Sequence, residues 1–304
     1  MIKAITVTNY VGESLRLELA RPELSGFAVL SVTGLGPGKA EINTSESSLH
    51  DGGVYNSARL PSRNIGITLM YLWNNGLEET RHLSYKYFPL KKKVTLLIET
   101  DTRKAEIEGY VESNEPSIFS SLECTSISIL CPDPYFYSSA EDGIRTTVFS
   151  STESKFEFPL CNNSLTANLI EMASSESIVN QAVVYDGDTE VGFTITIHAT
   201  GTATDITIAN QNTNEAMRIN TSRLESMTGL PITAGDDIVI STVARKKYIY
   251  LFRDGEKYNI LNCLDKNADW FKLRKGDNIF AYEAKSGRDN LQVKIEHRVV
   301  YEGV

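Results

Sequence analysis

Short runs in which apolar and polar residues alternate cover most of this chain, and this alternation limits what the chain can fold into. Side chains two residues apart lie on the same face of a β-strand, so each run predicts a strand with one buried face. Clear examples are residues 64–72, 94–100, 104–112 and 122–130, which are rich in Val, Ile and Thr. The sequence therefore predicts a mainly β protein.

One segment of the first half departs from this pattern and predicts a helix. Within Leu77–Phe88, the residues Leu77, Leu83 and Tyr87 approach helical spacing. Pro89 ends the segment, because the residue before a proline avoids the helical conformation. We expect one helix with charged flanks among the strands of the first half.

The second half contains many short alternating runs separated by turn residues. Asp254-Gly255 is the strongest hairpin signal, because a two-residue turn with positive φ suits both residues. Short strands at such spacing predict an antiparallel β-sandwich. The nine expected strands are 155–159, 191–199, 204–210, 216–220, 237–242, 248–253, 257–260, 278–283 and 291–300.

The length of the chain predicts two domains. At 304 residues it is longer than most single hydrophobic cores grow. Ser138–Ser154 is dense in Ser and Thr, and we interpret it as a linker. The expected domains are residues 1–145 and residues 146–304.

Charge and hydropathy exclude two classes of partner. The net charge of −9 and the pI near 5.1 disfavour nucleic-acid binding, which needs clustered Lys and Arg. Lys91-Lys92-Lys93 is a dense basic run, but it is short. No segment approaches the ~18 apolar residues of a membrane helix, and the N-terminus has no apolar block of signal-peptide length. We expect a soluble protein made in a cytoplasm, with no membrane contact.

The usual catalytic and metal-binding residues are scattered. The four histidines His50, His82, His198 and His297 lie far apart in the sequence, which favours surface or hydrogen-bonded histidines over a triad or a metal set. The four cysteines show neither zinc spacing nor the density of a disulfide scaffold, so we expect buried free thiols. No catalytic residue, metal site or cofactor is predicted. The cysteines are Cys124, Cys131, Cys161 and Cys263.

Two short stretches resemble ligand loops but have simpler explanations. Gly34–Lys39 (GLGPGK) is rich in glycine, yet Pro37 lacks an N–H and no strongly capped helix follows to bind an anion. Asp236 and Asp237 offer carboxylates to a calcium ion, but adjacent strand residues point to opposite faces. A loop leaving a strand and a turn entering one are the favoured interpretations.

Aromatic residues of the second half raise the possibility of sugar binding, since exposed rings stack on apolar sugar faces. The candidates are Trp270, with Tyr248 and Tyr250 as neighbours. However, residues 270–280 alternate as a strand would, which would bury Trp270 or its neighbour in the core. Both alternatives stay open from the sequence.

The string ILCPDPYFY at 129–137 ends the first domain. Cys131 reads as a small buried residue, and Pro132 and Pro134 stop a strand because neither donates a backbone hydrogen bond. Asp133 can tie the turn through the backbone. Tyr135, Phe136 and Tyr137 can anchor the exit to the barrel or to the next domain. We interpret Cys131–Tyr137 as a domain-closing motif.

The order of motifs in the first half adds a resemblance. Four stretches follow one another: Asn64–Thr68 (NIGIT), Arg81–Lys91 (RHLSYKYFPLK), the hairpin Val94–Asp101 with Glu108–Glu112, and Ser126–Tyr137 (SISILCPDPYFY). In this order they resemble the N-terminal domain of the siphophage distal tail protein family (Dit), in which an aspartate-proline-aromatic ending closes that domain.

The second half is similar to the C-terminal domain of the same family, a galectin-like or carbohydrate-module-like sandwich. The two resemblances together cover nearly the entire chain. The matching stretches are Phe156–Leu160, Glu190–Ile197, Gly235–Thr242, Trp270–Asn278 and Tyr301–Gly303.

The resemblance implies a split β-barrel with one helix, followed by an antiparallel β-sandwich. It also implies a structural hub at the tip of a phage or phage-like tail, with no reaction to catalyse. Copies of the first domain would close into a sixfold ring that joins the tail tube protein to tail-tip or receptor-binding proteins. The ring would belong to the virion and be made in the cytoplasm of a bacterial host.

Three questions stay open at this stage. The loop Thr44–Arg63 is a candidate ring or tube contact, or else a disordered surface loop. The second domain is an attachment platform, or a carbohydrate-binding module that contacts host-surface glycans. A glycan hydrolase ranks third, since it needs paired carboxylates that only folding could bring together.

Overall fold

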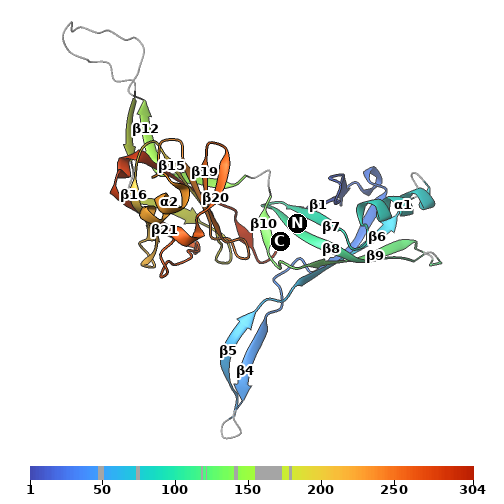
Figure 1. The fold of residues 1–304 in the computed structure, drawn as a ribbon. Coiled ribbons are helices and arrows are strands. Elements are labelled where there is room, and N and C mark those ends of the chain that lie inside the picture. The colour runs from blue at the N-terminus through green and yellow to red at the C-terminus, as the bar shows by residue number, and fades with distance from the viewer. Residues whose placement is uncertain are drawn as a thin grey trace. The chain divides into compact units, whose positions relative to one another are not determined.

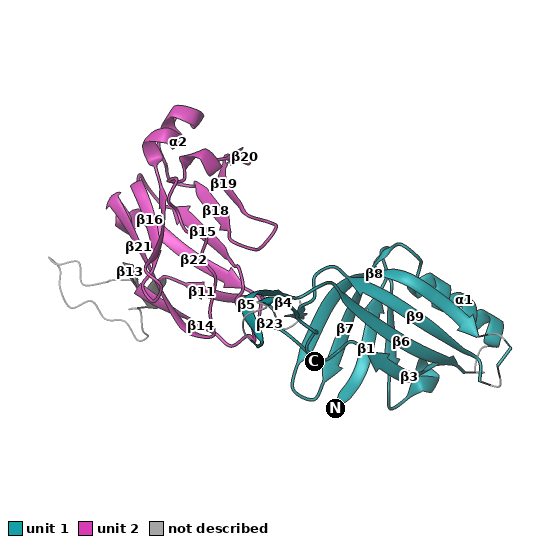
Figure 2. Ribbon diagram, turned by 90° about the horizontal axis from the view of Figure 1, so that it is seen from below, with its two compact units in different colours: residues 1–143, 300–304 teal, residues 144–299 magenta. Residues whose placement is uncertain are grey.

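The computed structural model describes residues 1–46, 51–72, 76–117, 119–120, 122–139, 143–154, 173–177 and 180–304. They form two compact units, residues 1–143 with 300–304 and residues 144–299 (Figure 2). The mainly β fold class expected from the sequence is confirmed. The division differs from the expected 1–145 and 146–304 at the end of the chain, because Val300–Val304 lie in the first unit.

In the described part of the first unit, nine strands form one antiparallel sheet (Figure 1). The strands at the two ends of the main path, β2 and β3, contact each other, so the sheet curls around a core. The path is β2 (Ser14–Glu18), β1 (Ile2–Thr8), β7 (Lys93–Thr100), β8 (Lys104–Ser117), β9 (Cys124–Cys131), β6 (Arg63–Tyr71) and β3 (Phe27–Thr33), and the two remaining strands are β10 (Phe136–Ser138) and β23 (Val300–Tyr301).

Alternation along β6 explains how this core forms. Ile65, Ile67, Leu69 and Tyr71 all point inward and are at most 5% exposed, while the residues between them are half-buried. Each inward residue removes apolar surface from water, which favours folding by about 25 cal/mol per Å². The same alternation in β1, β7, β8 and β9 fills the rest of the core.

The predicted helix is confirmed as α1 (Leu77–Tyr87). Leu77, Leu83 and Tyr87, the residues with helical spacing, pack against the core of the first unit. A single-turn helix, η1 (Pro22–Leu24), precedes β3.

The expected loop Thr44–Arg63 is wrong, since most of its described residues belong to strands. β4 (Glu41–Glu46) and β5 (Gly53–Arg59) pair with each other as an antiparallel ribbon, and Arg63 begins β6. Figure 1 draws β4 and β5 as a two-stranded ribbon that forms a sheet of its own. Every residue of both strands is exposed.

The second unit is a sandwich of two antiparallel sheets whose inner faces share one core. Its described residues also include α2 (Thr221–Thr228), the single-turn helices η3 (Leu261–Cys263) and η4 (Arg288–Asn290), and the paired strands β12 (Ser150–Ser154) and β13 (Ala173–Ser177). The first sheet contains β11 (Arg145–Val148), β22 (Leu291–His297), β15 (Thr194–Ala199), β18 (Asp237–Ser241), β19 (Tyr248–Arg253) and β20 (Glu256–Asn259), and the second contains β14 (Asn180–Tyr185), β21 (Gly276–Ser286), β16 (Thr204–Asn210) and β17 (Glu215–Ile219).

The expected linker Ser138–Ser154 is also wrong. Its described residues include β11, which pairs with β22 at the edge of the larger sheet, and β12. Phe149 follows β11 and is 1% exposed in the core of the second unit. Ser and Thr are common on the outer face of a sheet, so their density does not by itself indicate a linker. The expected strand 155–159, the motif Phe156–Leu160, Cys161 and His50 lie outside the described residues.

Candidate functional site

The domain-closing motif begins at a buried thiol. Cys131 is the last residue of β9 and has no exposed surface. Burial raises the pKa of the Cys131 thiol to about 11, so the thiol is protonated at neutral pH. Among the described residues, no group of three or more His, Cys, Asp or Glu side chains could hold a metal ion. Cys131 therefore packs as a small apolar side chain.

The other described cysteines lie outside this motif. Cys263 is also buried, whereas Cys124 is partly exposed, which corrects the expectation that Cys124 is buried.

Asp133 ties the turn of the motif with both of its carboxylate oxygens. Oδ1 accepts a hydrogen bond from the backbone N–H of Tyr135 at 3.3 Å, and Oδ2 accepts one from the hydroxyl of Tyr137 at 2.8 Å. This turn lies between Pro132 and Pro134, where the β9 ladder stops. The carboxylate thus fixes the direction in which the chain leaves β9.

The chain then enters β10, which is paired on both sides. Tyr137 is opposite Glu106 of β8 on one side, and Phe136 and Tyr137 are opposite Tyr301 and Val300 of β23 on the other. Phe136 is fully buried in the core of the first unit. Phe136 and Tyr137 therefore anchor the exit to the first unit, together with Val300 and Tyr301 of β23.

Arg63 connects the parts of this site, and sequence reasoning missed it. Its guanidinium donates hydrogen bonds to four backbone carbonyl oxygens: Pro134 at 2.7 Å, Gly34 at 2.8 Å, Gly36, and Glu302 at 2.7 Å. The side chain is 6% exposed.

The carbonyl dipoles take the place of a carboxylate partner at this buried cation. Burial lowers the pKa of Arg63, but an arginine remains charged at any physiological pH. The Arg63 guanidinium also lies 4.7 Å from the centre of the Phe136 ring, which adds a cation–π contact. Three segments far apart in the sequence are thus held by one side chain. We call Arg63 and its four carbonyl partners the Arg63 node.

The loop GLGPGK is part of this node, not a phosphate loop. Gly34 has a positive φ, and a Cβ there would collide with the carbonyl oxygen of Asn64. Only glycine fits this position, because it has no Cβ and adopts a positive φ without strain. The backbone N–H of Val304 donates to the carbonyl of Leu35 at 3.0 Å. The end of the chain therefore lies along this loop.

One signal in the sequence could have indicated the node. Arg63 occupies the first inward-facing position of the alternating run Arg63–Tyr71. A charged residue at an inward position must find buried hydrogen-bond partners. The identity of those partners depends on the return of the chain at Glu302, which local pattern does not reveal.

The structure brings two of the three candidate sugar-stacking residues together. Tyr248 and Tyr250 lie on the outer face of β19 with ring centroids 4.7 Å apart, and Phe252 continues the row at 6.5 Å. The Lys257 ammonium lies 3.7 Å from the centre of the Tyr250 ring. Tyr250 is therefore held between Tyr248 and Lys257, and Tyr248 is the half-exposed end of the stack.

Trp270 lies apart from this row. Its ring is partly buried against the core of the second unit, and the Lys247 ammonium is 5.1 Å from the ring centre. Residues 270–275 do not form a strand, although Leu273 makes an isolated bridge to Val191. Trp270 thus combines a core contact with some exposed surface.

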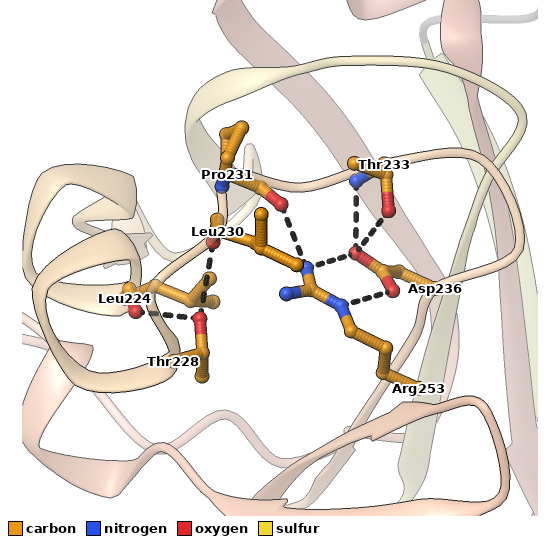
Figure 3. A network of polar contacts seen from close by, with 7 residues as sticks. All are labelled: Leu224, Thr228, Leu230, Pro231, Thr233, Asp236 and Arg253. Carbon is orange, nitrogen blue, oxygen red and sulfur yellow. Dashed lines mark hydrogen bonds and ion pairs between the residues drawn. The ribbon is translucent and has the colours of Figure 1, made fainter.

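The two adjacent aspartates point in different directions, as the strand geometry predicts. Asp236 is buried and accepts from Nε of Arg253 at 2.7 Å and from the N–H of Thr233 at 2.8 Å, while Arg253 also donates to the Pro231 carbonyl (Figure 3). Burial alone would raise the pKa of Asp236, but these hydrogen bonds outweigh it and hold the pKa below its usual value. Asp237 instead lies 2.7 Å from Nδ1 of His198 on the outer face. The Asp236–Arg253 ion pair braces the loop after α2, and the carboxylates of Asp236 and Asp237 point away from each other instead of toward one shared cation.

The described histidines do not come together. His82 contacts Glu78 on α1, His198 contacts Asp237, and His297 is 3% exposed beside the ring of Tyr185.

Among the described residues, no helix is long and apolar enough to cross a membrane.

Residues 186–301 match the family model described as siphovirus-type tail component, C-terminal domain. Among solved structures, the chain is similar to the Dit protein (gp 19.1) of phage SPP1, described as a paradigm of the hub of the adsorption apparatus in phages that infect Gram-positive bacteria. That match has 12% identity and a TM-score of 0.63, and it covers 97% of this chain and 99% of the other. A chain of the phage P2 baseplate in its activated conformation with calcium has 13% identity, a TM-score of 0.49 and 98% coverage of both chains. No curated protein sequence matches.

The family match gives the class of protein to which the second unit is similar. Residues 186–301, which cover most of the second unit, match the C-terminal domain of siphovirus-type tail components. Within that class, the family model and the fold of nearly the whole chain support a distal tail protein.

Proposed function

We propose that this chain is the hub of the tail tip: copies of the first unit close into a sixfold ring that joins the tail tube protein to tail-tip or receptor-binding proteins. The chain acts as a building block of the virion, assembled from subunits made in the bacterial cytoplasm, and catalyses no reaction. The matched family is structural, which supports a role without catalysis.

The exposed ribbon β4–β5 is the observation that carries this proposal. A two-stranded hairpin is at best marginally stable in water without a partner. Here every residue of both strands is exposed, including Ile42 at 64%, Val54 at 69% and Tyr55 at 64%. A ribbon of this kind gains stability by packing on another subunit.

The pairing register separates the two faces of the ribbon. Ile42 is opposite Ala58, and Thr44 is opposite Tyr55, so these four residues share the more apolar face. Asn43 is opposite Ser57 on the other face. A ring needs one face of each subunit to meet a different face of its neighbour, and the apolar face of the ribbon supplies one half of such a heterologous contact.

Mass measurement and negative-stain imaging of the purified chain test this proposal. We expect rings of the wild-type chain, and loss of rings in the double variant Ile42→Thr/Tyr55→Thr with the thermal midpoint retained. The matched control Asn43→Thr/Ser57→Thr changes the opposite face and should still form rings. Monomers of the wild-type chain at every salt and protein concentration, including in the presence of tail tube protein, would contradict the hub.

A second candidate function is adhesion to host-surface glycan by the second unit. The row of stacked rings on the outer face of β19 favours it, with Tyr248 as the end ring available to a sugar. Retention on cell-wall polysaccharide should fall for Tyr248→Ala. Trp270→Ala is the weaker probe, because Trp270 also packs against the core and its removal should lower stability. Unchanged retention of Tyr248→Ala would remove the support for this candidate.

A further inference from the structure

The loop between β18 and β19 carries an exposed basic run in an otherwise acidic chain. Arg245, Lys246 and Lys247 are all exposed. In the part of the chain that the structure describes, none of the three is in an ion pair. Lys272 and Arg274, by contrast, both contact Glu190. Three unpaired cations in one loop concentrate positive charge where the net charge of −9 would not predict it.

The backbone at Arg245 makes this run more unusual. Arg245 has a positive φ, in the left-handed region that is unfavourable for most residues with a Cβ. Asp and Asn tolerate this region, and Asp205, Asn214 and Asp254 occupy such positions elsewhere in the second unit. The turn thus holds a long cationic side chain where glycine or asparagine would be more stable. Strain of this kind is typical of sites where the side chain has a function.

Aromatic rings lie directly beside these cations. The Lys247 ammonium is 5.1 Å from the centre of the Trp270 ring, and Tyr248 follows Lys247 in sequence at the head of the stacked row. Lys257 lies over Tyr250 further along the row. We define the basic–aromatic surface as Arg245, Lys246, Lys247, Tyr248, Lys257 and Trp270.

We propose that the basic–aromatic surface binds an anionic polysaccharide, one whose sugar or polyol units carry phosphate groups. The inference rests on the candidate glycan adhesion and names its ligand class. The cations bind the phosphate groups, and the half-exposed rings bind the apolar faces of the repeating units. A neutral glycan would leave the three loop cations without an anionic partner.

Nucleic acid fits the surface less well. Duplex DNA is densely charged along its axis and is bound by long basic tracks that neutralise many phosphates. Here the cations are few, and carboxylates such as Glu190 and Asp269 lie close in sequence or space to Lys272 and Trp270. A substituted polysaccharide carries fewer charges per unit length than DNA, which matches a surface with one short cationic run beside aromatic rings.

The test compares polymers that differ in charge. The full chain is passed over immobilised dextran, dextran phosphate and double-stranded DNA at about 50 mM and about 300 mM salt, since screening weakens exposed charge contacts at the higher value. We expect binding to dextran phosphate that weakens with salt, and little binding to dextran. The variant Arg245→Asn/Lys246→Gln/Lys247→Gln should bind dextran phosphate at least about tenfold more weakly than the wild-type chain.

A matched control is available in the first unit. Lys91→Asn/Lys92→Gln/Lys93→Gln removes the same charge from the other basic run, which also contains a lysine at positive φ, Lys91. This control should bind within about twofold of wild type. The loop variant should keep or raise its thermal midpoint, because asparagine tolerates the backbone conformation at position 245.

Each other outcome overturns the inference in a recognisable way. Equal loss in both triple variants would show attraction by overall charge, and equal or tighter binding of DNA would show a nucleic-acid surface. Binding of plain dextran that the loop variant retains would leave glycan adhesion standing without the anionic ligand. A chain that forms rings but binds none of the polymers would remove the adhesion candidate as well and leave the hub intact.

Discussion

Nη2 of Arg63 donates a hydrogen bond of 2.7 Å to the carbonyl oxygen of Glu302, a residue 239 positions further along the chain. The contact joins the first strand residue after the exposed ribbon to the end of the polypeptide. Because the same guanidinium also binds Pro134, Gly34 and Gly36, the first unit is complete only when the chain has returned from the second.

Replacing Arg63 should destabilise the first unit strongly. Arg63→Met removes four hydrogen bonds and leaves buried carbonyls without donors, which should lower the free energy of unfolding by about 2–4 kcal/mol. Arg16→Met is the matched control, because Arg16 is an exposed arginine of the same unit paired with Glu99. An exposed pair of this kind should cost about 0–1 kcal/mol. Chemical denaturation monitored by fluorescence measures both. Equal effects would show that the Arg63 node adds nothing to stability.

Removal of Val300–Val304 should affect the first unit alone. Val300 is 2% exposed, β23 pairs with β10, and Val304 packs against the core of the first unit. Scanning calorimetry of the truncated chain should show the transition of the first unit at lower temperature and that of the second unchanged. Glu302→Ala is the control and should lower the first transition less than the truncation, since it keeps the backbone carbonyl that accepts from Arg63.

Among the described residues of the second unit, Arg253–Asp236 should be the ion pair whose loss lowers stability most. Both side chains are at least nine-tenths buried, so Arg253→Met leaves an unpaired carboxylate in the interior and should cost about 3–5 kcal/mol. Arg218→Met breaks a pair with Asp205 in which the arginine is half-exposed, and should cost about 0–1 kcal/mol. Thermal unfolding followed by circular dichroism compares the two, and a loss below about 1 kcal/mol for Arg253→Met would contradict the assignment.

His297 should make the second unit less stable in mild acid. Burial, and to a lesser extent the positive charge of Arg145, lowers the pKa of His297 in the folded chain, while Asp186 opposes the shift. The unfolded chain, with a histidine pKa near about 6.5, therefore binds more protons as the pH falls below that value. The contribution of neutral His297 to the free energy of unfolding is fully present above about pH 6.5. Below that pH it decreases, by at most about 1.4 kcal/mol per pH unit for this one group.

A variant isolates this contribution. His297→Phe keeps a ring against Tyr185 and removes the titration, so its thermal midpoint should change less than that of wild type between about pH 7.5 and 5.5. An unchanged pH dependence in His297→Phe would assign the acid sensitivity to other groups.

The sequence predicted the elements whose signal is local. The alternating runs became strands close to their expected limits, such as β16 at Thr204–Asn210 and β19 at Tyr248–Arg253, because each strand has one buried face. The Asp254-Gly255 hairpin is present, with both residues at positive φ. Helix α1 followed from spacing and from the proline that ends it.

Elements whose stability comes from distant partners were missed. β11 contains one Arg and two Thr among its four residues, a composition that suggested a linker. It is a strand because it pairs with β22. Helix α2 begins with the Asn220 cap and ends at Gly229 in the left-handed conformation, and both are ordinary helix signals. Because the helix spans only eight residues and follows a strand pattern, these two helix signals were not recognised in the sequence. The Arg63 node needed the return of the chain, and periodicity describes only neighbours along the sequence.

The strands β10 and β23 are neighbours, and they are also the points where the chain leaves the first unit and re-enters it. Topologically, all residues between them form one very long hairpin loop. A short turn in their place would leave an ordinary β-hairpin and an unbroken strand order in the first unit. The second unit is thus an insertion between two neighbouring strands of the first unit, and it contributes no strand to the sheet of the first unit.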